Sequence, residues 1–399
     1  MTEKYYLDDS YLFEFTGRIR DIRKKDAGYE IILDATAFYP ESGGQLCDTG
    51  HLDARQVINV FENDAGDIVH VCPDWSAPVD SEVTGRIDRE RRLDNMRKHT
   101  GQHILTQSLI QTVKAKTVSS HLGDEESTIE LSIDSITDDD IFESEKLAND
   151  TVMQNLPVKI SYHERSELEK LGVRKIPERR GRYRIVQVGD FDCTACGGTH
   201  CRRTGEVGPI KIISQEKIRG HIRVTFLTGR QAIIDYHRKH DVVSRLSSRL
   251  TCHFTDIEDS FEKIAAQTGE LKKEVGRLHR ELTPVEIERL KSSAIDAAGF
   301  RIITAVYRNQ DFKYLRELGQ ELVQSDKIFA LFMADDRLLI SVSEGIKPDA
   351  SELAKIFIDK YEGRGGGNPA VAQVGGITDG KQETYLNEFA GFIRDEFGG

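Results

Sequence analysis

The chain has 399 residues and carries 55 Lys and Arg against 67 Asp and Glu, a formal net charge of −12. Hydrophobic residues make up 38% of it and charged residues 31%, enough for about two or three domains with cores of their own, so global disorder is excluded. The mean hydropathy is −0.46 and no run of about eighteen apolar residues occurs, which excludes a membrane span.

The N-terminus and the cysteines indicate the compartment. Residues 1–9 have no basic segment followed by an apolar core, so we expect no secretory signal. Three of the six cysteines, Cys193, Cys196 and Cys201, lie within nine residues. Such clustering in a long chain favours metal or redox chemistry over disulfides. We therefore expect a cytoplasmic protein in a reducing environment.

Residues 1–88 are predicted to form a small β-barrel-like domain. A strand-like segment at 29–33 follows one turn, and a second turn at 63–67 separates two more. Short strands with regular turn signals are typical of barrels and sandwiches. The stretch from Thr36 to Gln45 contains two consecutive glycines. It is either a plain barrel turn or a loop whose backbone and amide groups approach a ligand.

Residues 89–235 are predicted to form an α+β domain. Apolar residues at helical spacing after position 92 indicate one helix of about 20 residues. The segments that follow are a strand at 127–133, an acidic helix at about 138–153, and strands at 158–162 and 183–188.

Residues 236–298 are predicted to form a helical arm. Apolar residues recur with 4-3 spacing between Ile257 and Leu282 and have charged residues between them, which indicates a long amphipathic helix of coiled-coil character. Thr283 and Pro284 match the N-cap and first position of a second helix. We therefore expect a hairpin of two helices.

Residues 299–399 alternate strand-like and helical segments and end in a glycine-rich loop at 363–369. This alternation predicts a small α/β domain. The whole chain is therefore predicted to be an α+β multidomain protein.

Two residue pairs with equal spacing indicate a metal site. His99 and His103 lie four residues apart on the predicted helix, so they share one face and can bind one ion. Cys196 and His200 repeat this spacing across two glycines that permit a tight turn. One cysteine with three histidines suits Zn²⁺. The metalloprotease motif is excluded because Thr100 stands where that motif requires a glutamate.

Two further cysteines compete as ligands. Cys193 forms a Cys-x-x-Cys pair with Cys196, and Cys201 adjoins His200. The alternative, in which all these residues are ordinary buried or exposed side chains, is weakened because both spaced pairs fall in one predicted domain.

A basic run precedes the cysteine cluster. Residues 174–184 hold six basic side chains and one acidic. The net negative charge of the chain argues against a nucleic-acid partner, but a local basic run can override the sum. A solvated face is the alternative interpretation of such a run.

Three segments together resemble a known family. In this order, Thr36 to Gln45, His99 to His103 and Cys196 to His200 resemble the editing domain of alanyl-tRNA synthetase and its freestanding versions, the alanyl-tRNA editing proteins of the AlaX family. The stretch 363–376 resembles the DHHA1 domain that ends alanyl-tRNA synthetase, so the likeness covers most of the chain and matches the long AlaX form. Ser42 departs from relatives that have a third glycine there, and it should still allow the turn.

The resemblance implies hydrolysis, in trans, of tRNA(Ala) mischarged with serine, with glycine as a second candidate. It implies Zn²⁺ at His99, His103, Cys196 and His200. It also implies that the loop from Thr36 to Gln45 lines the amino-acid pocket, with Thr36 distinguishing the seryl hydroxyl and Gln45 contacting the substrate. The candidate contacts to tRNA phosphates are the basic residues of the run 174–184, which include Arg174, Arg179, Arg180, Arg182 and Arg184, together with Arg202, Arg203, Arg219 and Arg223.

The arm and the C-terminal domain have two candidate roles. Residues 236–399 either reach the outer corner of the tRNA or form a homodimer. No phosphate-binding glycine-lysine loop and no Asp-His-His cluster occur in the sequence, so the DHHA1-like part is expected to bind rather than cleave. Nothing before residue 1 leaves room for an ATP-using domain, so we expect no aminoacylation.

Two other functions are consistent with the same residues. One is a non-catalytic tRNA- or RNA-binding protein with a structural zinc, which four closed ligands would favour. The other is a metal-dependent hydrolase of a different acylated substrate, such as a different aminoacyl-tRNA.

Overall fold

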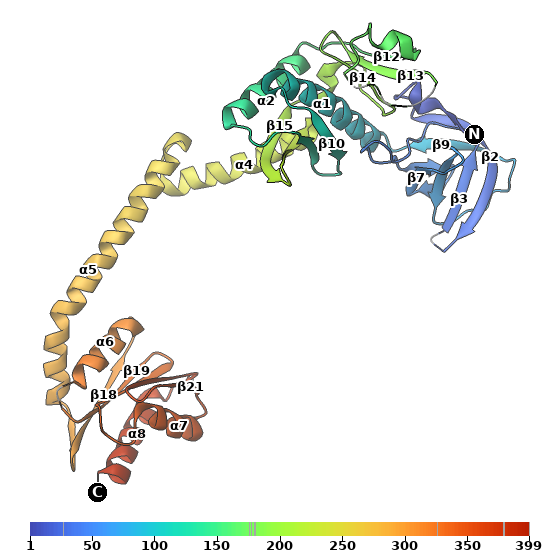
Figure 1. Ribbon diagram of the computed structural model, residues 1–399. Coiled ribbons are helices and arrows are strands. Elements are labelled where there is room, and N and C mark those ends of the chain that lie inside the picture. The colour runs from blue at the N-terminus through green and yellow to red at the C-terminus, as the bar shows by residue number, and fades with distance from the viewer. Residues whose placement is uncertain are drawn as a thin grey trace. The chain divides into compact units, whose positions relative to one another are not determined.

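The computed structural model describes residues 1–26, 28–174, 176, 178, 181–324, 326–377 and 380–398 (Figure 1). The chain divides into two compact units, Met1–Arg249 and Leu250–Gly399. Across the residues so described, no helix combines the length and the apolar character that a bilayer crossing requires.

The first unit begins with a seven-stranded antiparallel sheet that curls into a nearly closed barrel. Its two end strands, β6 and β7, are linked through Ile58, whose N–H donates to the carbonyl of Val71 on β8 (2.9 Å). This confirms the predicted barrel. In spatial order the strands are β6 (Arg55–Val57), β5 (Gly50–Leu52), β9 (Glu82–Ile87), β2 (Glu14–Lys25), β3 (Gly28–Leu33), β8 (Ile68–Cys72) and β7 (Asn59–Glu62).

A short N-terminal segment closes one end of this barrel. Strand β1 (Glu3–Lys4) pairs in parallel with β4 (Ala35–Thr36), and a 3-10 turn follows at Tyr5–Leu7. The chain after β4 runs as an irregular loop, residues 37–49, which we call the pocket loop. It leads to β5 and then, through β9, to the first helix.

Helix α1 (Arg89–Val113) starts at Asp88, whose side chain accepts a hydrogen bond from the N–H of Arg91. Its central residues, from Lys98 to Thr106, are all buried. Such close burial requires a small residue: a Cβ on Gly101 would lie 2.6 Å from Thr228 Cγ2. The helix that carries two predicted ligands is therefore fixed on every side.

Two small sheets and one long helix surround α1. The predicted acidic helix is α2 (Asp138–Met153), which begins with a capping box between Thr137 and Asp140. One sheet has the order β10 (Thr117–Leu122), β11 (Ser127–Leu131), β16 (His221–Thr228), β15 (Ile210–Ile218); the other has β12 (Val158–His163), β13 (Tyr183–Val188), β14 (Asp192–Ala195), with the one-turn helix α3 (Arg165–Leu168).

The predicted helical hairpin is wrong. Helix α4 (Gly229–Leu250) is followed by a 3-10 turn at Phe254–Asp256 and then by α5 (Ile257–Ser292), which runs straight through Pro284. The Thr283 hydroxyl donates to the carbonyl of His279 (2.7 Å) within this turn. The helix continues because its last turns are packed: Leu290 is fully buried in the core of the second unit.

The second unit has a six-stranded sheet with helices on both faces. Helix α6 and the end of α5 cover one face, and α7 and α8 cover the other. The prediction that this domain ends in a glycine-rich loop is wrong. Residues 364–367 form strand β21, and the chain continues through β22 to helix α8. The order is β17 (Ile295–Ala297), β18 (Phe300–Tyr307), β19 (Ile328–Ala334), β20 (Arg337–Val342), β22 (Val371–Gly375), β21 (Arg364–Gly367), with α6 (Phe312–Leu322), α7 (Ala350–Tyr361) and α8 (Gln382–Phe397).

Candidate metal centre

The four predicted ligands meet in the first unit. His99 and His103 come from α1, and Cys196 and His200 come from the loop after β14. Their ligand atoms all lie within 4.8 Å of one another, and Cys196 Sγ is 3.3 Å from Nε2 of both His99 and His200. The fold therefore brings two pairs of ligands, from segments that lie far apart in the chain, into one group.

A glycine makes this convergence possible. A Cβ on Gly198 would lie 2.1 Å from Cε1 of His99 and 2.9 Å from Oε1 of Gln45. Real Cβ atoms do not approach other atoms so closely, so only glycine allows the Cys196 loop to pass beside α1. The Gly198 N–H also donates to Cys196 Sγ (3.4 Å).

Each of the three histidines has its Nδ1 directed at another protein group. A second partner on Nδ1 fixes the ring and leaves Nε2 free to bind a metal. The partners are Gln45 Oε1 for His99 (2.7 Å), Thr100 Oγ1 for His200 (3.2 Å) and Asp192 Oδ2 for His103 (3.5 Å).

Asp192 is the charged residue among the three groups that face Nδ1 of the histidines. It is only 4% exposed, and Arg174 pairs with it, with Nε 3.1 Å from Oδ1. Nδ1 of His103 has no well-formed hydrogen bond among the described residues. Arg174, predicted to contact tRNA, therefore balances the carboxylate that faces His103.

The protonation states of the group suit a metal. Burial lowers the pKa of His99 to about 3, aided by the charge of Arg184, and burial with the neighbouring imidazoles lowers the pKa of His200 well below its usual value. Burial alone would raise the pKa of the Cys196 thiol. The hydrogen bond and charge of His103 act in the opposite direction, and the net pKa is lowered. A neutral imidazole at His99 and at His200 and a readily ionised thiol at Cys196 are forms that bind a metal. The donor set fits zinc.

Sequence reasoning did not single out Arg184 as part of this centre. Its side chain is 4% exposed, with Nη1 donating to the carbonyl of Cys196 (2.6 Å) and Nε to that of Leu7 (2.8 Å). It belongs to the basic run that predicted a phosphate-binding surface. In the structure it holds the Cys196 loop and the N-terminal segment together.

A buried ion pair fixes the pocket loop to α1. Arg92 and Asp48 are both fully buried and form a bidentate pair, and Arg92 Nη1 also donates to the carbonyl of Ser10 (2.8 Å). Arg92 Nη2 donates to the carbonyl of Ala37 (2.6 Å), and Asp48 accepts from the N–H of Tyr39 (2.6 Å). Arg92 lies seven residues before His99, on the same face of α1. Sequence periodicity could have flagged it, but not its partner.

The two predicted pocket residues are both fully buried. The Thr36 hydroxyl lies 2.8 Å from His70 Nε2 and accepts from the N–H of Phe38 (3.1 Å). His70 Nδ1 donates to the carbonyl of Ile31 (3.0 Å), so its Nε2 accepts the hydroxyl proton. Direct contact of Thr36 or Gln45 with a substrate stays a prediction.

The competing cysteines lie outside the ligand group. Cys193 sits on β14 and packs beside Leu168, Tyr183 and Ile185. Cys201 is buried in the α1 core, and burial raises the pKa of its thiol to about 12. Within the described residues, the metal-binding group has His99, His103, Cys196 and His200 as its members.

The predicted tRNA contacts differ in their exposure and in their protein partners. Arg179 and Arg180 lie outside the described residues. Arg223 pairs with Glu130 (2.7 Å), and Arg203 donates to the carbonyl of Asn155 (2.7 Å). Arg182 is 66% exposed and lies 3.8 Å from Glu164. Arg202 is 65% exposed, lies 3.3 Å from Asp9 and stacks on Tyr11, and Arg203 is exposed as well. Arg219 lies on the exposed β15–β16 turn.

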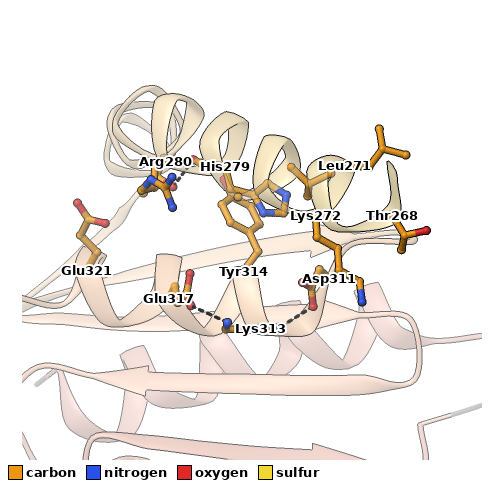
Figure 2. Close-up of a pocket in the computed structure, with 13 residues that line it drawn as sticks. Thr268, Leu271, Lys272, His279, Arg280, Asp311, Lys313, Tyr314, Glu317 and Glu321 are labelled. Atoms are coloured by element: carbon orange, nitrogen blue, oxygen red, sulfur yellow. Dashed lines mark hydrogen bonds and ion pairs between the residues drawn. The ribbon is translucent and has the colours of Figure 1, made fainter. Parts of the chain in front are cut away.

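The second unit has a groove between α5 and α6, shown in Figure 2. Its volume is about 840 Å³, and the ring of His279 stacks on that of Tyr314 at 4.0 Å. The charged residues that line it are Lys272, Arg280, Asp311, Lys313, Glu317 and Glu321. The groove therefore has aromatic and basic groups together with acidic ones.

Comparison with known proteins places the chain beside alanyl-tRNA synthetases. Residues 183–224, which include Cys196 and His200, match the family model "Threonyl and Alanyl tRNA synthetase second additional domain". The alanine–tRNA ligases of Archaeoglobus fulgidus and Pyrococcus abyssi are each 32% identical to the chain, over 386 and 387 residues. Each match covers 93% of this chain and 42% of the relative. The chain thus spans less than half the length of these curated relatives.

One similar solved structure is the C-Ala domain of the alanyl-tRNA synthetase from Aquifex aeolicus. It is 25% identical, covers 27% of this chain and 98% of that chain, and has a TM-score of 0.23.

Proposed function

We propose that this chain, which fits an AlaX-like alanyl-tRNA editing protein, is a zinc-dependent hydrolase that deacylates mischarged tRNA(Ala). The observation that carries the proposal is the group of His99, His103, Cys196 and His200, in a chain related over 93% of its length to alanine–tRNA ligases. Seryl-tRNA(Ala) is the main proposed substrate, and glycyl-tRNA(Ala) the second. We place this activity in the cytoplasm, where tRNA is charged.

The chain's own residues divide the work. Zinc bound at the four side chains would supply a Lewis acid for the ester carbonyl or for water. Gln45, Thr100 and Asp192 orient the three imidazoles. Arg184 and Gly198 hold the Cys196 loop in place.

Discrimination against alanine is proposed to rest on Thr36. Its hydroxyl proton is committed to His70, so the oxygen can only accept a further hydrogen bond. A seryl hydroxyl could donate to it, whereas alanine would leave this buried oxygen without that partner. Because Thr36 is fully buried, substrate entry would require the pocket loop to move.

The tRNA is proposed to be held by both units. Arg182, Arg202, Arg203 and Arg219 are exposed candidates for phosphate contacts near the acceptor end. A DHHA1-like C-terminal domain and the groove between α5 and α6 are candidates for a more distant part of the tRNA. The apolar stripe of α5 is the candidate surface for a homodimer.

A second candidate function is favoured by the closed ligand set. Four protein side chains fill a tetrahedral zinc site, which is the usual arrangement for a structural metal. The chain would then be a tRNA-binding protein without turnover.

The deciding experiment compares serine and alanine on the same tRNA. The full chain, with its zinc content measured, is incubated with seryl-tRNA(Ala) and alanyl-tRNA(Ala), and release of each amino acid is followed. We expect serine to be released, alanine to be spared, and about one zinc per chain. If zinc is bound and neither ester is cleaved, the binding-protein alternative replaces the hydrolase. Cleavage of seryl esters on tRNAs without alanine identity would indicate a different substrate.

A further inference from the structure

Gln45 connects the pocket loop to both segments that carry the metal ligands. Its Oε1 lies 2.7 Å from Nδ1 of His99 on α1 and accepts from the N–H of Thr199 (3.1 Å) on the Cys196 loop. Its Nε2 donates to Oγ1 of Thr199 (2.9 Å). The residue is fully buried, so these protein groups occupy both ends of its amide.

The backbone around Gln45 is held in a tight turn. Ser42 and Gln45 exchange two backbone hydrogen bonds (3.0 and 3.1 Å) across Gly43 and Gly44, which both have positive φ. The carbonyl of Gly44 accepts from the N–H of Leu122 on β10 (2.8 Å). The turn is therefore docked against β10 by its backbone and against the metal ligands by the side chain of Gln45.

The hydrogen bond from His99 sets the chemistry of that imidazole. The Gln45 oxygen can only accept, so Nδ1 of His99 carries a proton and Nε2, 3.3 Å from Cys196 Sγ, carries the lone pair. If Gln45 did not accept this proton, His99 could turn or change tautomer, and the donor set would lose one nitrogen.

We infer that Gln45 is a positioning residue which makes the order of the loop tip, residues 42–47, depend on metal binding at His99, His103, Cys196 and His200. A bound metal holds His99 and the Cys196 loop in place, and Gln45 transmits that restraint to the turn that lines the proposed pocket. Without the metal, the same two anchors are free to move and the turn loses its side-chain attachment. The inference rests on metal binding in the proposed function, but not on hydrolysis of any ester.

The test measures zinc affinity and backbone exchange in the full-length protein. Gln45→Met keeps the size of the side chain and removes its hydrogen bonds. We expect its zinc affinity, measured against a competing chelator, to fall about 10- to 100-fold. Gln45→Glu keeps an acceptor for His99 and for the N–H of Thr199, so it should retain most of the affinity. Gln102→Met is the matched control, because Gln102 is a buried glutamine on α1 that bonds to Thr106 instead (2.7 Å).

Hydrogen exchange tests the coupling without any substitution. In the wild-type chain, amides 42–47 should exchange faster after zinc removal than with zinc bound, and Gln45→Met should reduce this difference. If wild-type zinc binding leaves the exchange of these amides unchanged, or Gln45→Met binds zinc as tightly as wild type, the inference is overturned. A wild-type chain that binds no zinc would overturn the zinc part of the proposed function as well.

Discussion

The metal centre and helix α5 differ in how their side chains are partnered. At the centre, His99 and His200 each have a hydrogen-bond partner on Nδ1, and the outer residues Gln45 and Arg184 also have protein partners. Along α5, several residues with 4-3 spacing are largely exposed, such as Phe261 at 67% and Leu271 at 66%. The proposed hydrolysis would require the geometry of the centre to be set in advance. An exposed apolar stripe is a candidate surface for another molecule.

The largest expected effect breaks the centre itself. Cys196→Ala removes the only sulfur donor of the group, so we expect loss of zinc, loss of hydrolysis and a loosened α1 core, because metal binding and folding are coupled. Metal content, deacylation and thermal unfolding measure the three effects. Cys193→Ala is the control, since Cys193 lies outside the group, and it should keep its zinc. Zinc retained by Cys196→Ala would contradict the assigned ligand set.

The next effect breaks the attachment of the pocket loop. Arg92→Met leaves Asp48 buried without its partner, which should cost about 3–5 kcal/mol of unfolding free energy. Urea titration that follows the unfolding of the first unit measures this free energy. Arg86→Met on β9 is the control, because loss of its exposed pair with Glu14 should cost less than about 1 kcal/mol. Equal losses of unfolding free energy in the two variants would contradict a larger contribution from the buried pair.

A smaller effect appears as a pH dependence. Burial lowers the pKa of His70 to about 4 from an ordinary value of 6.5. Between these values the unfolded chain binds the extra proton, so stability present above pH 6.5 is lost as the pH falls toward 4. We expect His70→Gln to reduce the loss of unfolding free energy between pH 7 and pH 5 by about 2 kcal/mol.

Denaturant titrations at the two pH values measure this difference. His51→Gln, an exposed histidine of the same barrel, is the control and should follow the wild-type curve. The same slope in His70→Gln as in wild type would show that His70 does not account for the acid sensitivity.

The smallest effect on stability is expected on α5, where it sharpens the contrast with the centre. Leu271→Lys should change the unfolding free energy by less than about 0.5 kcal/mol, because the side chain is exposed. If the stripe joins two chains, the same change should convert a dimer into a monomer in sedimentation experiments while zinc content stays the same. An unchanged oligomeric state would leave the tRNA as the proposed partner of this helix.

Local patterns in the sequence predicted much of what is local in the structure. The four-residue spacing of His99 and His103 is enough to place both on one face of α1, because helix geometry fixes that relation. The same holds for the acidic helix α2 and for the barrel strands between turns. Pro284 shows the limit of such reasoning, since a local signal for a helix start was overridden by the packing of Leu290.

Only the tertiary structure decided which distant groups meet. Cys196 lies 97 residues after His99, and no periodicity relates them; burial of α1 and the close passage of Gly198 bring them together. The contacts of Gln45, Asp192 and Arg184 are equally invisible in the sequence, because each side chain could serve several partners. The sequence by itself determined the ligand types and their local spacing. Long-range packing determined their convergence, since burial requires each polar group to find a partner in space.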